Sequence, residues 1–212
     1  MVLQKIGNSQ SLTDRAYQSV KDAIINNYIK PGEKLVEEDL TKMLGVSRTT
    51  VRSALQKLSY ERWVQVIPGV GYVVAILESQ DAKNLFVVRR PLELLAIELA
   101  IEMANDEELL EIETVFHKQK KLHLAGDFMG VIEQNLEFHD NIARSTKNDW
   151  LREILFSLNS QLQRFFILSQ NMEKRSPNII REHESIINAL KNRDKEYAKE
   201  IISSHVIWKE EV

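Results

Sequence analysis

Residues Leu40–Leu58 read LTKMLGVSRTTVRSALQKL, and this stretch decides the fold of the N-terminal third of the chain. Its second half places apolar side chains at the spacing of a helix that packs on one side: Val51, Ala54, Leu55 and Leu58. Gly45 can adopt the left-handed conformation that ends a preceding helix, and Ser47 is a good N-cap for the next one. The stretch therefore predicts two helices joined by a tight turn, the arrangement that places a helix in the major groove of DNA.

The outer face of the second helix carries the side chains that DNA recognition requires. Arg48 and Arg52 lie one turn apart near its N-terminal end, with Thr49 beside them. An arginine offers a two-pronged donor for guanine, and a hydroxyl can contact a phosphate or the methyl group of thymine. The alternative is an ordinary solvated helix face. The hairpin expected just after this helix favours DNA binding.

The flanking sequence completes a module of three helices and a hairpin. Lys30-Pro31-Gly32 ends the first helix, and Pro68-Gly69-Val70-Gly71 provides the turn of the hairpin. The expected elements are helices over about 12–28, 36–44 and 48–60, and strands over 63–67 and 72–76.

At this point the sequence resembles a known family. The run PGEKLVEEDLTKMLGVSRTTVRSALQKL, followed by a hairpin with Gly71, resembles the winged helix-turn-helix of GntR-type bacterial transcription regulators over about residues 10–76. The resemblance implies that Arg48 and Arg52 are the principal contacts to a double-stranded DNA operator. It assigns supporting roles to the following residues: Ser47, Thr49, Thr50 and Gly71 of the wing.

Two positions depart from the family pattern. Many relatives carry a DNA-contacting arginine where Glu38 stands here, which implies a different operator sequence. The family usually has glycine at the position of Arg62, just before the first strand of the hairpin. A residue with a side chain is expected to lower stability there if the turn is left-handed.

From Ser79 onward every pattern is helical. The expected helices span about 79–104, 106–125, 127–145, 149–170, 176–191 and 194–210. The fold class is therefore mainly α, with a winged helix-turn-helix domain over residues 1–77 and an all-α six-helix bundle over residues 78–212.

The helical half is similar to the FCD type of domain, found in the FadR branch of GntR regulators. Three segments carry the resemblance: Arg89–Glu93 (RRPLE), Asn135–Asn148 (NLEFHDNIARSTKN) and Arg181–Val206. It implies a homodimer, a small-molecule effector that is often a carboxylate, and in many members a bound divalent metal. Arg89 resembles the arginine that faces the effector pocket. The alternative for Arg89 is an ion pair with Glu93 on the same helix.

Helical geometry predicts a metal site independently of the family. Asn135 and His139 are four residues apart and share one helix face. His183 and His205 lie at nearly equal distances from the helix break at Asn192–Asp194, so in an antiparallel hairpin they stand at the same height. Three imidazoles and an amide oxygen suit Zn²⁺, Ni²⁺ or a similar ion. The alternative is that each histidine is an ordinary core or surface residue.

Asn135 is the unusual member of this set, because the family pattern most often has aspartate at its position. A neutral amide oxygen is a poorer ligand than a carboxylate. We therefore expect either weaker metal binding or an anion supplied by water or by the carboxylate of the effector.

Composition and charge limit the functional classes. The 212-residue chain has no cysteine, which excludes disulfides, thiolate metal sites and cysteine nucleophiles. Residues 1–77 carry ten Lys or Arg and seven Asp or Glu, and the remainder carries 18 and 24, so a mildly basic third precedes an acidic body. No stretch resembles a signal peptide or approaches the ~18 apolar residues needed to span a bilayer, which predicts a cytoplasmic protein without a membrane partner.

The favoured function is a homodimeric transcription regulator that binds a palindromic operator and senses a small molecule, a carboxylate by resemblance, in a metal-containing C-terminal pocket. One alternative is a metal-responsive regulator with no organic effector. The other is a metal-dependent hydrolytic enzyme. No obvious general base accompanies the candidate ligands, so we predict that the protein is not an enzyme.

Overall fold

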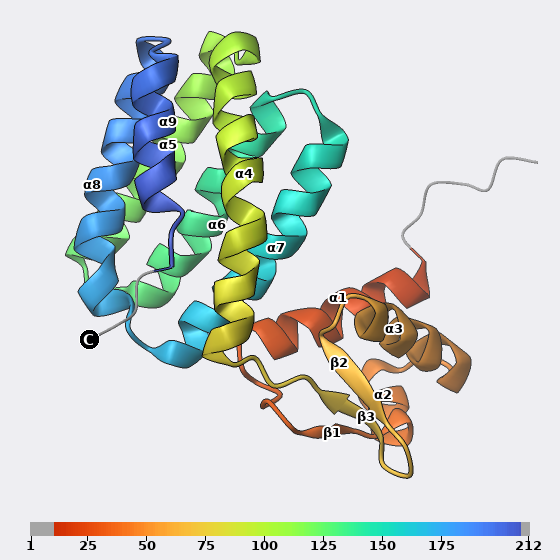
Figure 1. Cartoon of the computed structure of the whole chain (residues 1–212). Coiled ribbons are helices and arrows are strands. Elements are labelled where there is room, and N and C mark those ends of the chain that lie inside the picture. The colour runs from red at the N-terminus through yellow and green to blue at the C-terminus, as the bar shows by residue number, and fades with distance from the viewer. Residues whose placement is uncertain (1–10, 209–212) are drawn as a thin grey trace, which may run out of the picture. The chain divides into compact units, whose positions relative to one another are not determined.

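The computed structural model describes residues 11–208, which form two compact units that divide between Ile76 and Leu77 (Figure 1). The described residues hold nine helices and one three-stranded sheet. The mainly helical fold class expected from the sequence is confirmed. None of the helices in this part of the chain is long and apolar enough to span a membrane.

The N-terminal unit is a three-helix module with a small sheet. Its elements are α1 (Leu12–Ile25), β1 (Lys34–Leu35), α2 (Glu37–Leu44), α3 (Arg48–Tyr60), β2 (Val64–Ile67) and β3 (Gly71–Val74). Helix α1 packs against α3, and the strands pair antiparallel in the order β1-β3-β2. The hairpin is as expected, but the short strand β1 is an addition. Two residues directly before a helix are too few to show the alternating pattern of a strand.

The turn between α2 and α3 forms as its residues predict. Gly45 ends α2 in the left-handed conformation with φ 65°, and the Ser47 hydroxyl accepts a hydrogen bond from the Thr50 backbone N–H at 3.2 Å. Leu55 and Leu58 are completely buried against the rest of the module. The packed face of α3 therefore fixes which of its side chains point outward.

The C-terminal unit is an all-helical bundle. Its helices are α4 (Ser79–Met103), α5 (Asp106–Leu124), α6 (Phe128–Ser145), α7 (Asp149–Ser169), α8 (Met172–Lys191) and α9 (Lys195–His205). Helix α6 packs against α4, α5, α7 and α8, and α9 packs against α4 and α8 (Figure 1). This arrangement brings side chains of α6, α8 and α9 together inside the bundle.

Three helix ends differ from the sequence prediction. Helix α1 ends at Ile25 and not near residue 28, because Asn27 takes the left-handed conformation with φ 58° before Lys30-Pro31-Gly32 is reached. Helix α8 begins at Met172, so the predicted start at residue 176 is wrong and Pro177 lies inside the helix. The Ser176 hydroxyl lies 3.4 Å from the Glu173 carbonyl, the group that Pro177, without an N–H, cannot bond. Helix α9 ends at His205 and not at residue 210, and residues 209–210 lie outside the described residues.

Candidate DNA-binding surface and metal centre

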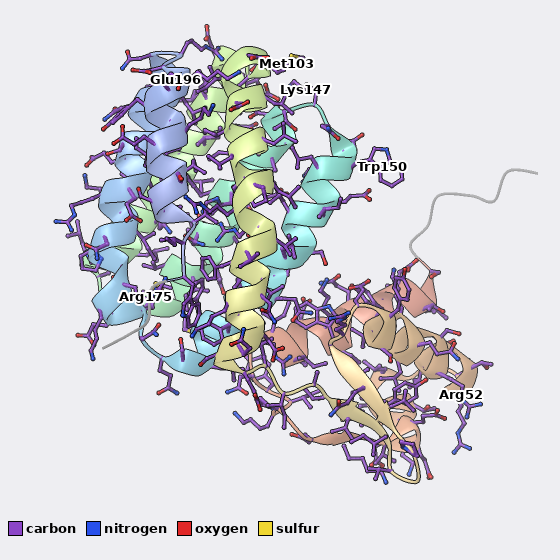
Figure 2. The ribbon with its side chains drawn as sticks, in the orientation of Figure 1. Arg52, Met103, Lys147, Trp150, Arg175 and Glu196 are labelled. Atoms are coloured by element: carbon purple, nitrogen blue, oxygen red, sulfur yellow. The ribbon has the colours of Figure 1, made fainter. Side chains whose placement is uncertain are left out.

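The recognition face of α3 is exposed as its sequence predicts. Arg48, Thr49 and Arg52 are exposed, and Figure 2 shows Arg52 projecting from the helix. Thr50 is half-buried, and its hydroxyl lies 2.8 Å from that of Ser47. Ser47 and Thr50 therefore order the start of the helix, which presents the two arginines outward.

Both arginines face acidic side chains of α2. Arg52 donates from Nε to Glu37 Oε1 at 3.0 Å and from its terminal NH2 to Glu37 Oε2 at 2.9 Å. Arg48 lies 4.0 Å from Glu38. The hydrogen bond from Arg52 lowers the pKa of the Glu37 carboxyl below its ordinary value. The spacing of residues within α2 and α3 does not predict these ion pairs, because they join two helices.

The segment after α3 explains how the wing begins. Arg62 has φ 63°, and the Trp63 backbone N–H donates to the Leu58 carbonyl at 2.9 Å, which is the left-handed Schellman end of a helix. The turn at Arg62 is therefore left-handed, the condition under which a residue with a side chain is expected to lower stability. In the wing turn, Gly71 is exposed and has φ 103°, a conformation that favours glycine.

Three histidines from separate helices meet inside the C-terminal bundle. The Nε2 atoms of His139 on α6 and His205 on α9 are 3.1 Å apart, and those of His183 on α8 and His205 are 3.3 Å apart. One ligand atom from each residue lies within 4.8 Å of the other two. His139 and His183 are fully buried. The equal heights of His183 and His205 that the sequence predicted bring the two rings together.

The other nitrogen of each ring has an oxygen acceptor. His139 Nδ1 lies 3.1 Å from a Glu93 oxygen, and His205 Nδ1 lies 2.7 Å from a Glu182 oxygen. His183 Nδ1 lies 2.7 Å from Gln119 Oε1, and the amide of Gln119 is oriented by donation from its Nε2 to the Val131 carbonyl. Carboxylate and amide oxygens accept, so each Nδ1 is the atom that carries the proton.

The tautomers fixed in this way leave a lone pair on each Nε2. The three Nε2 lone pairs therefore face one another, and no Nε2 carries a proton that it could donate to another. This arrangement is unfavourable unless a cation lies among the three atoms. Histidines that ligate metals normally donate their second N–H to such acceptors. The donor set thus fits a divalent ion held by His139, His183 and His205.

Burial keeps the rings of His139 and His183 in the ligating form. Burial lowers the pKa of His139 to about 4, although the Glu93 carboxylate opposes this shift. Burial, and then the neighbouring histidines, hold the pKa of His183 well below its ordinary value. Glu93 shows the reverse: burial raises its pKa, but His139 and Arg89 outweigh burial and hold it low. Neutral imidazoles at neutral pH are the form that binds metals.

The three acceptors were missed as members of the site. Glu93 was considered only as an ion-pair partner of Arg89, and that pair also exists, with Arg89 Nε 2.9 Å from Glu93 Oε1. Gln119 left a signal in the sequence, because it continues the buried stripe of Ile112 and Phe116 on α5. A polar residue in such a stripe requires a buried partner.

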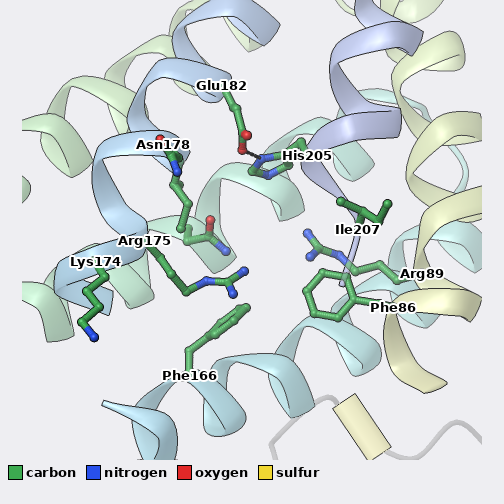
Figure 3. Close-up of a pocket in the computed structure, with 11 residues that line it drawn as sticks. Phe86, Arg89, Phe166, Lys174, Arg175, Asn178, Glu182, His205 and Ile207 are labelled. Carbon is green, nitrogen blue, oxygen red and sulfur yellow. Dashed lines mark hydrogen bonds and ion pairs between the residues drawn. The ribbon is translucent and has the colours of Figure 1, made fainter. Parts of the chain in front are cut away.

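A cavity of about 190 Å³ opens beside the histidines (Figure 3). Its wall contains His205, Asn135 and Arg89, together with residues of α7 and α8. The arginine that the resemblance assigned to an effector pocket therefore lines a cavity next to the candidate metal site. Asn135 borders the same cavity, and its role as a ligand stays a prediction.

The winged module, with its two exposed arginines, and the helical domain that follows it define a class of protein: the DNA-binding transcription regulators. The chain belongs to the GntR family of bacterial regulatory proteins, whose pattern matches residues 12–74, and residues 84–207 match the FCD domain. The relatives and the fold are those of transcription regulators and not of enzymes.

Similar proteins cover nearly the whole chain. An HTH-type transcriptional regulator of Bacillus subtilis, YdhC, is 31% identical over 190 residues, which are 89% of this chain and 85% of that protein. The regulator McbR of Escherichia coli is 28% identical over 88% of this chain and 85% of its own length. The solved structure of E. coli McbR/YncC has the same fold, with a TM-score of 0.81 at 24% identity over 93% and 94% of the two chains.

Proposed function

We propose that this regulator acts as a homodimer, binds a palindromic operator through α3 and the wing, and senses a small carboxylate beside a divalent metal. The observation that carries the proposal is the convergence of three histidine Nε2 atoms, two of them from buried side chains, next to a cavity that Arg89 lines. An effector that binds one dimer geometry better than another shifts the separation of the two recognition helices, and with it the affinity for DNA.

The metal is held by His139, His183 and His205. Three imidazole ligands suit Zn²⁺ or Ni²⁺. Asn135 contributes a weak or water-mediated fourth contact. A bound ion supplies a positive centre for a carboxylate oxygen at the edge of the cavity. Arg89 is held in place by its bond to Glu93, and its side chain is buried, so it is poised to bind the same carboxylate.

Dimerisation is assigned to the C-terminal unit. Helices α4 and α7 pack side by side and expose large apolar side chains: Val88 at 52%, Leu95 at 43%, Trp150 at 80% and Ile154 at 48%. A second copy that covers this face removes apolar surface from water. Two copies are also required because one winged module offers few contacts for specific binding.

Selection from a random DNA pool tests the DNA-binding part of the proposal. It should enrich an inverted repeat whose half-sites are about one helical turn apart, or a multiple of it. Adding a small carboxylate to metal-loaded protein should then change operator affinity. A change with metal alone, and none with any carboxylate, would favour the metal-responsive alternative. Enrichment of no palindromic site would contradict the dimeric mode of binding.

A further inference from the structure

One oxygen of Glu61 collects hydrogen-bond donors from two other segments of the N-terminal unit. The Tyr17 hydroxyl donates to Glu61 Oε2, and the Trp63 indole N–H donates to the same atom at 3.2 Å. The Lys21 ammonium lies 3.5 Å from this oxygen and donates to the Tyr17 oxygen at 2.9 Å. Tyr17 and Lys21 belong to α1, Glu61 caps the end of α3, and Trp63 directly precedes β2. These four residues, the Glu61 cluster, therefore join the first helix and the recognition helix to the start of the wing.

The partners of Glu61 are withdrawn from water. Trp63 is 1% exposed, and Tyr17 and Lys21 are also buried. Burial, and then the Glu61 carboxylate, raises the pKa of the Tyr17 hydroxyl above its ordinary value, so the hydroxyl keeps its proton and donates. The Lys21 ammonium lies 5.0 Å from the ring centre of Trp63 and 5.4 Å from that of Tyr17. A buried cation depends on a nearby opposite charge, so loss of the Glu61 charge would disturb the whole cluster.

Trp63 anchors the base of the wing. Its backbone N–H donates to the Leu58 carbonyl of α3, and its carbonyl accepts from the Ala75 N–H at 3.0 Å, just after β3. Strand β1 pairs with the β3 side of the hairpin at the same base. Toward the turn the hairpin projects into solvent (Figure 1), and Val66 is 59% exposed and Val70 42% exposed. The direction of the wing is therefore set at its base, where a small rotation of Trp63 produces a larger displacement of the turn.

We propose that Glu61 is a positioning residue for operator binding. Glu61 is half-buried and acts through Tyr17, Lys21 and Trp63: it fixes the direction of the wing relative to α3. The helix in the major groove and the wing on the neighbouring backbone then fit one half-site without rearrangement. This inference rests on the proposed function, because it explains how the two DNA-contacting parts of that function are held at one spacing.

Directed DNA cleavage measures the positions of the wing and of α3 separately. The chain has no cysteine, so one introduced cysteine attaches a DNA-cleaving iron chelate at a single place. Val70→Cys places the chelate on the wing turn, and Gln56→Cys places it on the exposed face of α3. Each full-length conjugate is bound to the operator obtained by selection, at a concentration that saturates the DNA. The cleavage pattern then reports position and not occupancy.

Glu61→Gln should move the wing and leave the recognition helix in place. Cleavage from the wing conjugate should spread to neighbouring nucleotides or shift along the strand, whereas cleavage from the α3 conjugate should stay unchanged. Operator affinity should fall by about threefold to tenfold, because one or two more groups must then be ordered on binding. A role in stability alone would lower the melting temperature and leave both cleavage patterns of the saturated complexes unchanged.

Two further variants test the cluster without relying on Glu61→Gln. Tyr17→Phe removes one donor and keeps the ring, so it should spread the wing cleavage in the same way but to a smaller extent. Asp22→Asn is the matched control for the loss of a negative charge. Asp22 follows Lys21 on α1, but it is exposed and accepts from Gln18 at 2.8 Å, outside the Glu61 cluster. This variant should keep both patterns.

Three results would overturn the inference: an unchanged wing pattern in Glu61→Gln, equal displacement of both patterns, or the same effect from Asp22→Asn. Each leaves the proposed function standing, because the operator is still bound. If the wild-type wing conjugate cleaves nothing while the α3 conjugate cleaves, the wing does not reach DNA. The wing part of the proposed function then fails together with this inference.

Discussion

Arg52 on the recognition helix and Glu37 on the preceding helix form a two-point ion pair, with N–O distances of 3.0 and 2.9 Å. The pair holds the guanidinium of Arg52 at one place on the surface expected to face DNA. It also puts a carboxylate next to that surface, where phosphates will approach.

Arg52→Ala should weaken operator binding by ~1–3 kcal/mol if Arg52 bonds two atoms of one guanine. Arg52→Lys is the companion variant, because lysine keeps the charge and loses the two-pronged donor. Fluorescence anisotropy on the selected operator and on an unrelated duplex measures both. Loss of affinity for both duplexes by the same factor would reassign Arg52 to a phosphate.

Glu37→Gln should increase affinity for unrelated DNA several-fold and lower the ratio of operator to unrelated binding. The first effect follows because one negative charge near the phosphates is removed, and the second because Arg52 loses the partner that orients it. Glu38→Gln is the charge-matched control, since Glu38 approaches Arg48 only to 4.0 Å. An unchanged ratio in Glu37→Gln would mean that the pair does not orient Arg52.

His183→Ala should abolish binding of one metal per chain and lower the melting temperature of metal-loaded protein to that of chelator-treated protein. A metal that binds only the folded state stabilises it by about 2.7 kcal/mol at 100 times its dissociation constant. His117→Ala is the control, because His117 is exposed on α5. Elemental analysis and calorimetry measure uptake. Full metal uptake by His183→Ala would refute the site.

Asn135→Asp should tighten metal binding, because a carboxylate adds a negative charge that attracts the cation. Calorimetric titration of the chelator-treated proteins measures the difference.

Leu95→Glu should convert the dimer to a monomer, because a charge placed in an apolar interface loses its water. Leu110→Glu is the matched control: Leu110 is 62% exposed and belongs to α5, which is neither of the two helices of the proposed interface, so that variant should stay dimeric. Light scattering gives the mass of each. A dimeric Leu95→Glu protein would place the interface elsewhere.

Arg62→Gly should stabilise the N-terminal unit by ~0.5–1 kcal/mol. Relief of the left-handed strain, about 1–2 kcal/mol, exceeds the added freedom of glycine in the unfolded chain, about 0.5–1 kcal/mol. Arg193→Gly is the contrasting variant. Arg193 has φ 53°, but its side chain donates to the Ile101 and Ala104 carbonyls at 2.6 Å, so its loss should destabilise. Thermal unfolding followed by circular dichroism measures both.

The sequence predicted those parts of the site that depend on position along a helix. The heights of His183 and His205 follow from counting residues to a turn, and their Nε2 atoms lie 3.3 Å apart. The partners Gln119 and Glu182 depend on how each helix is rotated against its neighbours. That rotation results from packing across the whole bundle, so periodicity within one helix does not contain it. The start of α8 differs from the prediction for a separate reason. Pro177 normally marks a helix start, but here the Ser176 hydroxyl bonds the Glu173 carbonyl that the proline cannot reach, and the helix continues through it.

His205 is the last residue of α9, and His139 lies 66 residues earlier in the middle of the chain. An ion bound to both acts as a removable cross-link that closes this long loop, as a disulfide does in proteins that have cysteine. Metal supply would then set how firmly the final helix is attached to the bundle. Amide hydrogen exchange in α9 should slow when the ion binds, because fraying of the chain end then requires breaking a metal–nitrogen bond.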